Sequence, residues 1–337
     1  MEYHQGYSAI TREIMDTQSS RFSRGYTIAF IATVLWSTTG ILISYLGRTY
    51  QLPSLVLAFW RDLFVAAGML LGLLAFSRKR FHLPRAQWKF MVLYGLTLAI
   101  FNSMWTFSVQ YNGAAVATVL AFSSPAMTAI LSRMVFKEQF SRVKVISIVL
   151  SLAGTVLVSG AISPEAWRLN PAGITFGLLT GLLFAIYNLE GKHASDQSID
   201  SWTALLYSFA AAAVFLLLFN AGDDAIAGKP LPGDLLWLGD SLSGWGILIF
   251  LGVAPTLGGF GLYTLSMRYL SPTVTNLIAT FEPVLTAVWA FLLFGELLHG
   301  IQLMGSLVLF AGIILLRLGE GRGGAEGAIE PANLYDM

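Results

Sequence analysis

Three charged side chains lie inside long apolar segments, where a charge is costly unless it has a partner or water. Arg61 stands about six residues into the segment 54–76, Asp62 follows it, and Glu282 stands near the middle of the segment 273–294. These groups could bind a zwitterion, the arginine taking a carboxylate and an acid taking an ammonium group, or could exchange protons. The structural alternatives are a buried ion pair between Arg61 and Glu282 and an arginine that reaches the nearby surface.

Uncharged polar residues recur at helical spacing in the segment 89–111. Asn102, Thr106 and Gln110 follow one another at intervals of four and therefore share one face of a helix. A polar face is unfavourable in lipid, so this stripe predicts either the wall of a permeation path or hydrogen bonds between helices.

Aromatic residues with polar groups form a further set of candidates. Trp36, Tyr187 with its neighbour Asn188, and Tyr263 all lie within apolar segments, where they suit an aromatic or amphipathic ligand. Packing, or an interfacial position for Tyr187, is the alternative.

Enzymatic chemistry finds no support in the sequence. The four histidines fall in predicted tails or loops, there is no cysteine, and no phosphate-binding loop of the Walker type is present. We therefore expect no catalytic residue, no metal site and no cofactor.

These candidates must be positioned by membrane-spanning helices. Of the 337 residues, 55% are hydrophobic and 12% are charged, which predicts an all-α integral membrane protein. A span takes about 20 apolar residues, and ten stretches meet or approach that length. They are 25–46, 54–76, 89–111, 113–135, 143–160, 172–190, 202–220, 245–266, 273–294 and 300–317.

The basic residues are sorted by side. With the N-terminus inside, 16 of the 20 lysines and arginines fall in cytoplasmic segments and three fall outside, while Arg61 lies within a span. The positive-inside rule then predicts a multi-pass protein of the inner membrane with both termini cytoplasmic. Residues 1–24 and 319–337 are expected to be cytoplasmic tails, the second one disordered. The net charge of +1 says nothing about partners on its own, and no nucleic-acid partner is expected.

The sequence repeats itself weakly at an offset of 158 residues. Residues 93–157 align with 251–315 without a gap at 14 identities in 65 positions, including Pro125 with Pro283. Each half, 25–160 and 172–318, contains five predicted spans, and an odd number inverts the second half. The same offset pairs Thr118 with Asn276 and Phe122 with Thr280, which places these four residues on inward faces.

Several motifs resemble those of the EamA-type transporters of the drug/metabolite transporter superfamily. They are Leu35-Trp36-Ser37, Ala58-Phe59-Trp60-Arg61, and the repeated Pro-x-x-Thr-Ala segment that ends in Phe-x-Glu at Glu138 and Glu296. The resemblance covers about 25–318 and implies ten helices and export of amino acids or related metabolites. One departure is Ser124 before Pro125, where the family often has an acid; Glu282 stands at the paired position.

We therefore expect a secondary transporter that exports a small organic metabolite by alternating access, with a proton gradient or the gradient of the cargo as its motor. The alternatives are multidrug efflux of lipophilic cations, and a membrane sensor or assembly protein that transports nothing. The expected partners are a small-molecule substrate, membrane lipid and, at most, a second copy of the chain, because the sequence leaves a monomer and a homodimer open.

Overall fold

The fold is known from a computed structural model, which describes residues 21–76, 83–137, 141–158, 162, 170–229, 233–294 and 300–327. This part of the chain is helical and contains no strand. A first helix covers 21–37. The helices and helical turns that follow are α2 (Thr39–Tyr50), α3 (Ser54–Phe76), η2 (Arg85–Gln87), α4 (Trp88–Ala121), α5 (Ser124–Phe136), α6 (Arg142–Val158), α7 (Pro171–Asp196), α8 (Ser201–Ile226), η4 (Gly233–Leu236), α9 (Leu242–Leu251), η5 (Gly252–Thr256), α10 (Leu257–Ser266), α11 (Pro272–Ala279), α12 (Glu282–Phe294) and α13 (Gly300–Gly327).

Seven helical stretches of the described chain are long and apolar enough to cross a membrane. They are Arg21–Gly47, Ser54–Ala75, Arg85–Ser108, Val119–Phe136, Pro171–Asp196, Ser201–Ile226 and Leu242–Ser266. The other three predicted spans also lie on helices, but α6 has 17 residues, 273–294 is divided into α11 and α12, and α13 has a shorter apolar stretch, Leu303–Leu316. The count of ten membrane crossings therefore stays a prediction.

The predicted boundary between the third and fourth spans is wrong. A break was expected at residue 112, but α4 keeps its helical backbone through to Ala121, over 34 residues. The equivalent break in the second half occurs at Ser271, because Pro272 begins α11 and lacks the N–H that would continue the preceding helix. At the offset of 158, Pro272 corresponds to Ala114, which carries that N–H group.

Helix bounds recur in the two halves at the offset of 158 residues. Ala121 and Ala279 end α4 and α11, α5 and α12 each have 13 residues, and α6 and α13 begin at Arg142 and Gly300. The breaks before α5 and α12 have a common cause, since Pro125 and Pro283 cannot donate to the carbonyl groups four residues earlier, those of Ala121 and Ala279.

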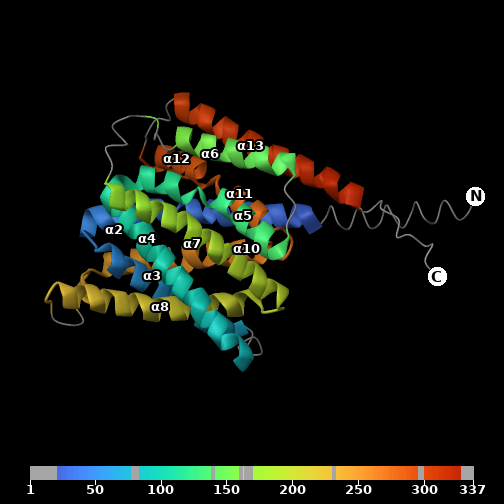
Figure 1. Cartoon of the computed structure of the whole chain (residues 1–337). Coiled ribbons are helices and arrows are strands. Elements are labelled where there is room, and N and C mark those ends of the chain that lie inside the picture. The colour runs from blue at the N-terminus through green and yellow to red at the C-terminus, as the bar shows by residue number, and fades with distance from the viewer. Residues whose placement is uncertain are drawn as a thin grey trace, which may run out of the picture.

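Glycines bring α6 and α13 into close contact, and the two helices lie side by side in Figure 1. A Cβ atom added to Gly154 would lie 2.8 Å from the carbonyl oxygen of Gly305, and one added to Gly312 would lie 3.2 Å from that of Ser147. Gly154 and Gly312 are equivalent in the sequence repeat. The absence of side chains at these positions lets the two backbones pack directly against each other.

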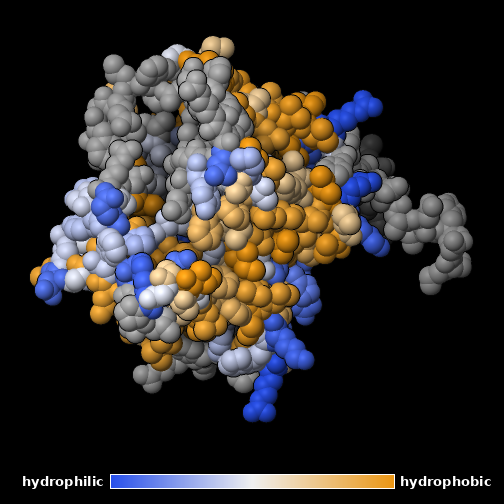
Figure 2. All heavy atoms as spheres, turned by 60° about the vertical axis from the view of Figure 1, so that its left-hand side comes forward, coloured by the Kyte–Doolittle hydropathy of each residue, from blue (hydrophilic) through white to orange (hydrophobic). Residues whose placement is uncertain are grey.

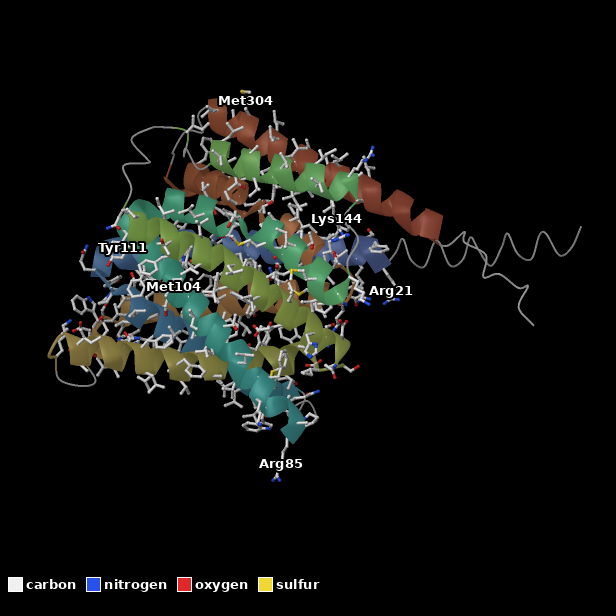
Figure 3. The ribbon with its side chains drawn as sticks, viewed as in Figure 1. Arg21, Arg85, Met104, Tyr111, Lys144 and Met304 are labelled. Carbon is white, nitrogen blue, oxygen red and sulfur yellow. The ribbon has the colours of Figure 1, made fainter. Side chains whose placement is uncertain are left out.

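The polarity of the surface changes along the long axis of the helices. Figure 2 shows an apolar surface over the middle of the described part, with hydrophilic side chains toward its edges. Figure 3 places Arg21, Arg85 and Lys144 toward one end and Tyr111 and Met304 toward the other. The two described ends of the chain, residue 21 and the end of α13, also lie toward the first of these (Figure 1).

The boundaries between the two predicted tails and the helices differ from those expected. The first helix starts at residue 21 rather than 25, and α13 continues to Gly327, whereas disorder was expected from residue 319. Extending an existing helix costs much less than nucleating one, so the apolar part of α13 carries the helix into the glycine-rich segment. Residues 1–20 and 328–337 lie outside the described residues.

Candidate functional site

Arg61, Asp62 and Asn102 form one buried network between α3 and α4. Arg61 donates from Nε to Asp62 Oδ1 at 3.2 Å and from an Nη atom to Asn102 Oδ1 at 2.5 Å. Asn102 donates from Nδ2 to Asp62 Oδ2 at 2.7 Å. All three residues are at most 9% exposed. Each therefore bonds with both others, and the two charges compensate each other.

The partner of Arg61 is not the one considered from the sequence. The structure pairs Arg61 with Asp62, its neighbour in the chain, rather than with Glu282. Adjacent residues of a helix point about 100° apart, but the long arginine side chain bends back far enough for its Nε to reach the carboxylate. Glu282 begins α12, is partly buried, and has no hydrogen-bond or ion-pair partner among the described residues.

A second polar network crosses between the two halves of the chain. Tyr263 on α10 donates its hydroxyl hydrogen to Asn188 Oδ1 on α7 at 2.7 Å. Thr128 Oγ1 on α5 accepts from Asn188 Nδ2 at 3.4 Å and from Asn276 Nδ2 on α11 at 2.9 Å. Asn276 also bonds with Ser124 on α5, 3.1 Å from Nδ2 to Oγ. These side chains are buried, so the network joins α5 of the first half to α7, α10 and α11 of the second.

Aromatic rings fill the space beside this second network. The ring of Trp36 lies 4.7 Å from those of Phe260 and Tyr263, and the ring of Tyr187 lies 5.7 Å from that of Phe260, measured between centroids. Phe184 lies 6.1 Å from Trp36. The structure thus brings Trp36, Tyr187 and Tyr263 into one cluster, and Tyr187 is fully buried rather than interfacial.

The threonines of the predicted site are placed differently. Thr106 and Thr280 donate their hydroxyl hydrogens to carbonyl oxygens of their own helices, those of Asn102 and Leu277. Thr280 is buried and Thr106 is partly buried. The side chain of Thr118 lies outside the described part, as does that of Gln110.

Three contributors to this region, Ser124, Thr128 and Glu190, were not among the site residues proposed from the sequence. Ser124 and Thr128 are small hydroxyl residues of a kind common in membrane helices, and the signal in the sequence was that they lie four residues apart and therefore share one helix face. Glu190 stood at the expected end of the segment 172–190, where a charge is ordinary. Because α7 continues to Asp196, Glu190 lies one and a half turns inside the helix.

The groups in the two networks and the aromatic cluster are suited to binding a ligand. They include one compensated charge pair, amide and hydroxyl groups from both halves, and several aromatic faces, a combination that can hold a small amphipathic organic molecule. In the described part of the chain no cluster of histidine, aspartate and glutamate is suited to a metal ion.

Comparison with known proteins places the chain among transporters. Residues 23–160 and 171–318 match the EamA-like transporter family. An "uncharacterized transporter" of Clostridium kluyveri is 21% identical over 87% of this chain and 92% of its own length. The threonine/homoserine exporter RhtA of Salmonella typhimurium is 25% identical over 73% of this chain and 77% of its own.

The fold also has a solved counterpart. One crystal structure superposes with a TM-score of 0.73 at 18% identity, over 89% of this chain and 98% of the other. The family match covers both halves, and the matched family and relatives are transporters rather than enzymes. The chain is a multi-pass membrane protein that belongs to the EamA-like transporter family.

Proposed function

We propose that this protein is a secondary active transporter that exports an amino acid or a related small metabolite by alternating access. The observation that carries the proposal is the buried network of Tyr263, Asn188, Thr128 and Asn276, which joins helices of both halves. In carriers built from inverted repeats the substrate site lies where the halves meet, and one half rocks against the other.

The helix breaks support the same mechanism. The chain interrupts α4–α5 and α11–α12 at repeat-equivalent positions beside the network, between Ala121 and Ser124 and between Ala279 and Glu282. Interrupted helices expose backbone groups and bend easily, and within a membrane they occur where the backbone is covered by protein or lines a cavity. The motor we propose is the proton gradient or the outward gradient of the cargo itself.

The orientation we propose places both termini in the cytoplasm of a ten-span, inverted-repeat protein. Arg21, Arg85 and Lys144 share one end of the molecule in Figure 3, as the positive-inside rule requires of a cytoplasmic end. Single-cysteine labelling tests this directly, because the chain has no cysteine. We expect Lys229→Cys to react with a membrane-impermeant maleimide in intact cells and Ser198→Cys to react after permeabilisation; the reverse pattern would invert the topology.

Transport itself is tested in liposomes that contain the purified protein. Amino acids are the first cargo to try, because a relative is named as a threonine/homoserine exporter. We expect vesicles loaded with unlabelled L-homoserine or another amino acid of the panel to accumulate the same labelled compound above protein-free vesicles. Asn276→Ala should reduce this counterflow while the protein remains folded. If folded protein exchanges no amino acid of the panel, the proposed cargo class is wrong.

Lipophilic cations are the second candidate cargo. The aromatic cluster around Trp36 and Tyr263 can bind an organic cation through the faces of its rings. Counterflow of labelled tetraphenylphosphonium, without counterflow of any amino acid, would favour this alternative.

A further inference from the structure

A third polar assembly joins α4, α7 and α10. We define the Glu190 cluster as Glu190 and Tyr187 on α7, Tyr94 and Thr97 on α4, and Thr264 on α10. Thr97 donates its hydroxyl hydrogen to Glu190 Oε1 at 3.1 Å, and the rings of Tyr94 and Tyr187 lie 4.7 Å apart. The Tyr187 hydroxyl lies near those of Tyr94 and Thr264 without a hydrogen bond to either. The cluster thus combines one carboxylate with four hydroxyl groups from three helices.

Most polar atoms of the cluster are buried without a hydrogen bond. The second carboxylate oxygen of Glu190 and the hydroxyls of Tyr94, Tyr187 and Thr264 have no partner among the described residues. Tyr94 and Tyr187 are fully buried, and Thr264 is 1% exposed. Buried polar groups are nearly always paired, and each unpaired group costs free energy. Four unpaired groups gathered in one place therefore indicate a site for a ligand.

The chemistry of these atoms selects the charge of the ligand. The free oxygen of Glu190 belongs to a carboxylate, which repels an anion. This oxygen and the hydroxyl oxygens can all accept hydrogen bonds, so a group with several N–H donors would satisfy them. A primary ammonium carries three such donors and one positive charge. The rings of Tyr94 and Tyr187 belong to the cluster, and the ring of Phe260 packs against that of Tyr187; aromatic faces such as these attract a cation.

We propose that the Glu190 cluster binds the ammonium group of the transported molecule. This inference rests on the proposed function and assigns one end of the cargo to named residues. Glu190 lies six residues before the end of α7, and Tyr94 lies six residues after the start of α4. Both are therefore about 9 Å from the same end of the molecule, the one where α4 begins near Arg85 in Figure 3.

The Glu190 cluster is displaced along the axis of α4 from the network of Arg61, Asp62 and Asn102. Thr97 and Asn102 lie on α4 five residues apart, or about 7.5 Å along the axis. Tyr187 belongs to the Glu190 cluster and its ring also packs against Phe260 of the aromatic cluster, so a cargo whose ammonium group is held at Glu190 would extend toward those rings. Under the proposed topology the Glu190 cluster lies nearer the cytoplasm than the network of Arg61, Asp62 and Asn102 does. The cytoplasm is the side from which an exporter takes its cargo.

Binding of matched probes to the purified full-length protein in detergent tests the proposal. The probes are phenethylammonium, 2-phenylethanol and 3-phenylpropionate, which share a phenylethyl body and differ in the terminal group; sodium chloride at equal ionic strength is the fourth arm. A ligand that binds the folded state alone raises the melting temperature in a concentration-dependent way. We expect phenethylammonium to raise it saturably and the other three additions to have no saturable effect.

Three variants relate this binding to the cluster. Glu190→Gln keeps the shape of the side chain, removes its charge, and should weaken phenethylammonium binding at least about tenfold, as loss of a charge-assisted contact does. Tyr187→Phe should weaken binding about threefold or more without lowering the melting temperature of the free protein, because the hydroxyl that it removes has no partner. Asp196→Asn is the matched control on the same helix: its carboxylate is exposed, pairs with Lys192, and should leave binding unchanged.

The binding and counterflow results distinguish a failure of the ammonium site from a failure of the proposed function. Equal binding of phenethylammonium by the wild type and by folded Glu190→Gln protein would overturn the proposal, as would saturable stabilisation by sodium ion without any by the amine. If Glu190→Gln does not fold, the Tyr187→Phe result decides. Liposome counterflow separates this inference from the proposed function. Amino-acid exchange that is insensitive to Glu190→Gln would refute the ammonium site and leave the transporter standing, whereas amine binding without exchange of any cargo would refute the transporter.

Discussion

Replacing Asp62 by leucine should destabilise the protein by about 3–5 kcal/mol, because it leaves the guanidinium of Arg61 buried without its counter-ion. Asp62 is 0% exposed and Arg61 is 9% exposed, so water cannot take the place of the carboxylate. The double variant Arg61→Met with Asp62→Leu removes both charges and should cost less, about 1–3 kcal/mol, for the Asn102 amide that loses both partners. The measurement is the free energy of unfolding by denaturant in mixed micelles.

The coupling between the two substitutions is the decisive quantity. Arg61→Met alone should also cost about 3–5 kcal/mol, because it leaves the carboxylate of Asp62 buried without its counter-ion. The two single losses together then exceed the loss in the double variant by about 3 kcal/mol or more, well beyond the roughly 0.6 kcal/mol of an average polar contact between membrane helices. Adding Asn102→Leu to the double variant should recover most of the remaining loss. A coupling below about 0.6 kcal/mol would refute the network as a source of stability. Glu282→Gln is the control for the alternative pairing: strong coupling of Arg61→Met to it would mean that Arg61 pairs with Glu282 instead.

Two further changes test packing and the network between the halves. Gly154→Ala should destabilise the protein by about 1–3 kcal/mol, since its Cβ would lie 2.8 Å from the Gly305 carbonyl oxygen, whereas Gly72→Ala, with no atom within 4 Å of the added Cβ, should stabilise α3 by up to about 1 kcal/mol; thermal unfolding of both variants decides. Tyr263→Phe should cost about 1–3 kcal/mol, because it deprives buried Asn188 Oδ1 of its donor, and it should also slow counterflow; a fully stable and active variant would contradict the role of this bond.

The sequence predicted the start of the ninth span well, because Pro272 begins α11 one residue before the expected residue 273. It did not predict the breaks at Pro125 and Pro283: the segments 113–135 and 273–294 were expected to be single spans, whereas α5 and α12 begin one residue before these prolines. It failed at residue 112, where no proline or capping residue ends α4. Helix ends without such a chemical cause depend on tertiary packing, which one sequence does not contain.

The structure brings together some of the residues proposed from the sequence, and their role as a site stays a prediction. Trp36, Tyr187 and Tyr263 were proposed as one set of aromatic candidates, and the structure packs their rings into one cluster. The partner of Arg61 was not predictable, because a side chain of that length reaches neighbours on its own helix as well as on others. Glu190 was missed for a simpler reason: the position of a charge along the membrane depends on where the helix ends, and α7 ends six residues later than expected.

Asn188 connects α7 to α5 of the other half through one long hydrogen bond. Its Oδ1 accepts from Tyr263 at 2.7 Å, a short bond within the second half, while its Nδ2 reaches Thr128 of the first half at 3.4 Å. Asn276, in contrast, holds α5 through both Thr128 and Ser124. A motion that parts α5 from α7 therefore breaks one long hydrogen bond, whereas a motion that parts α5 from α11 breaks several shorter ones. We expect rocking to carry α5 and α11 as one unit and to part α5 from α7, the helix that also bears Tyr187 and Glu190.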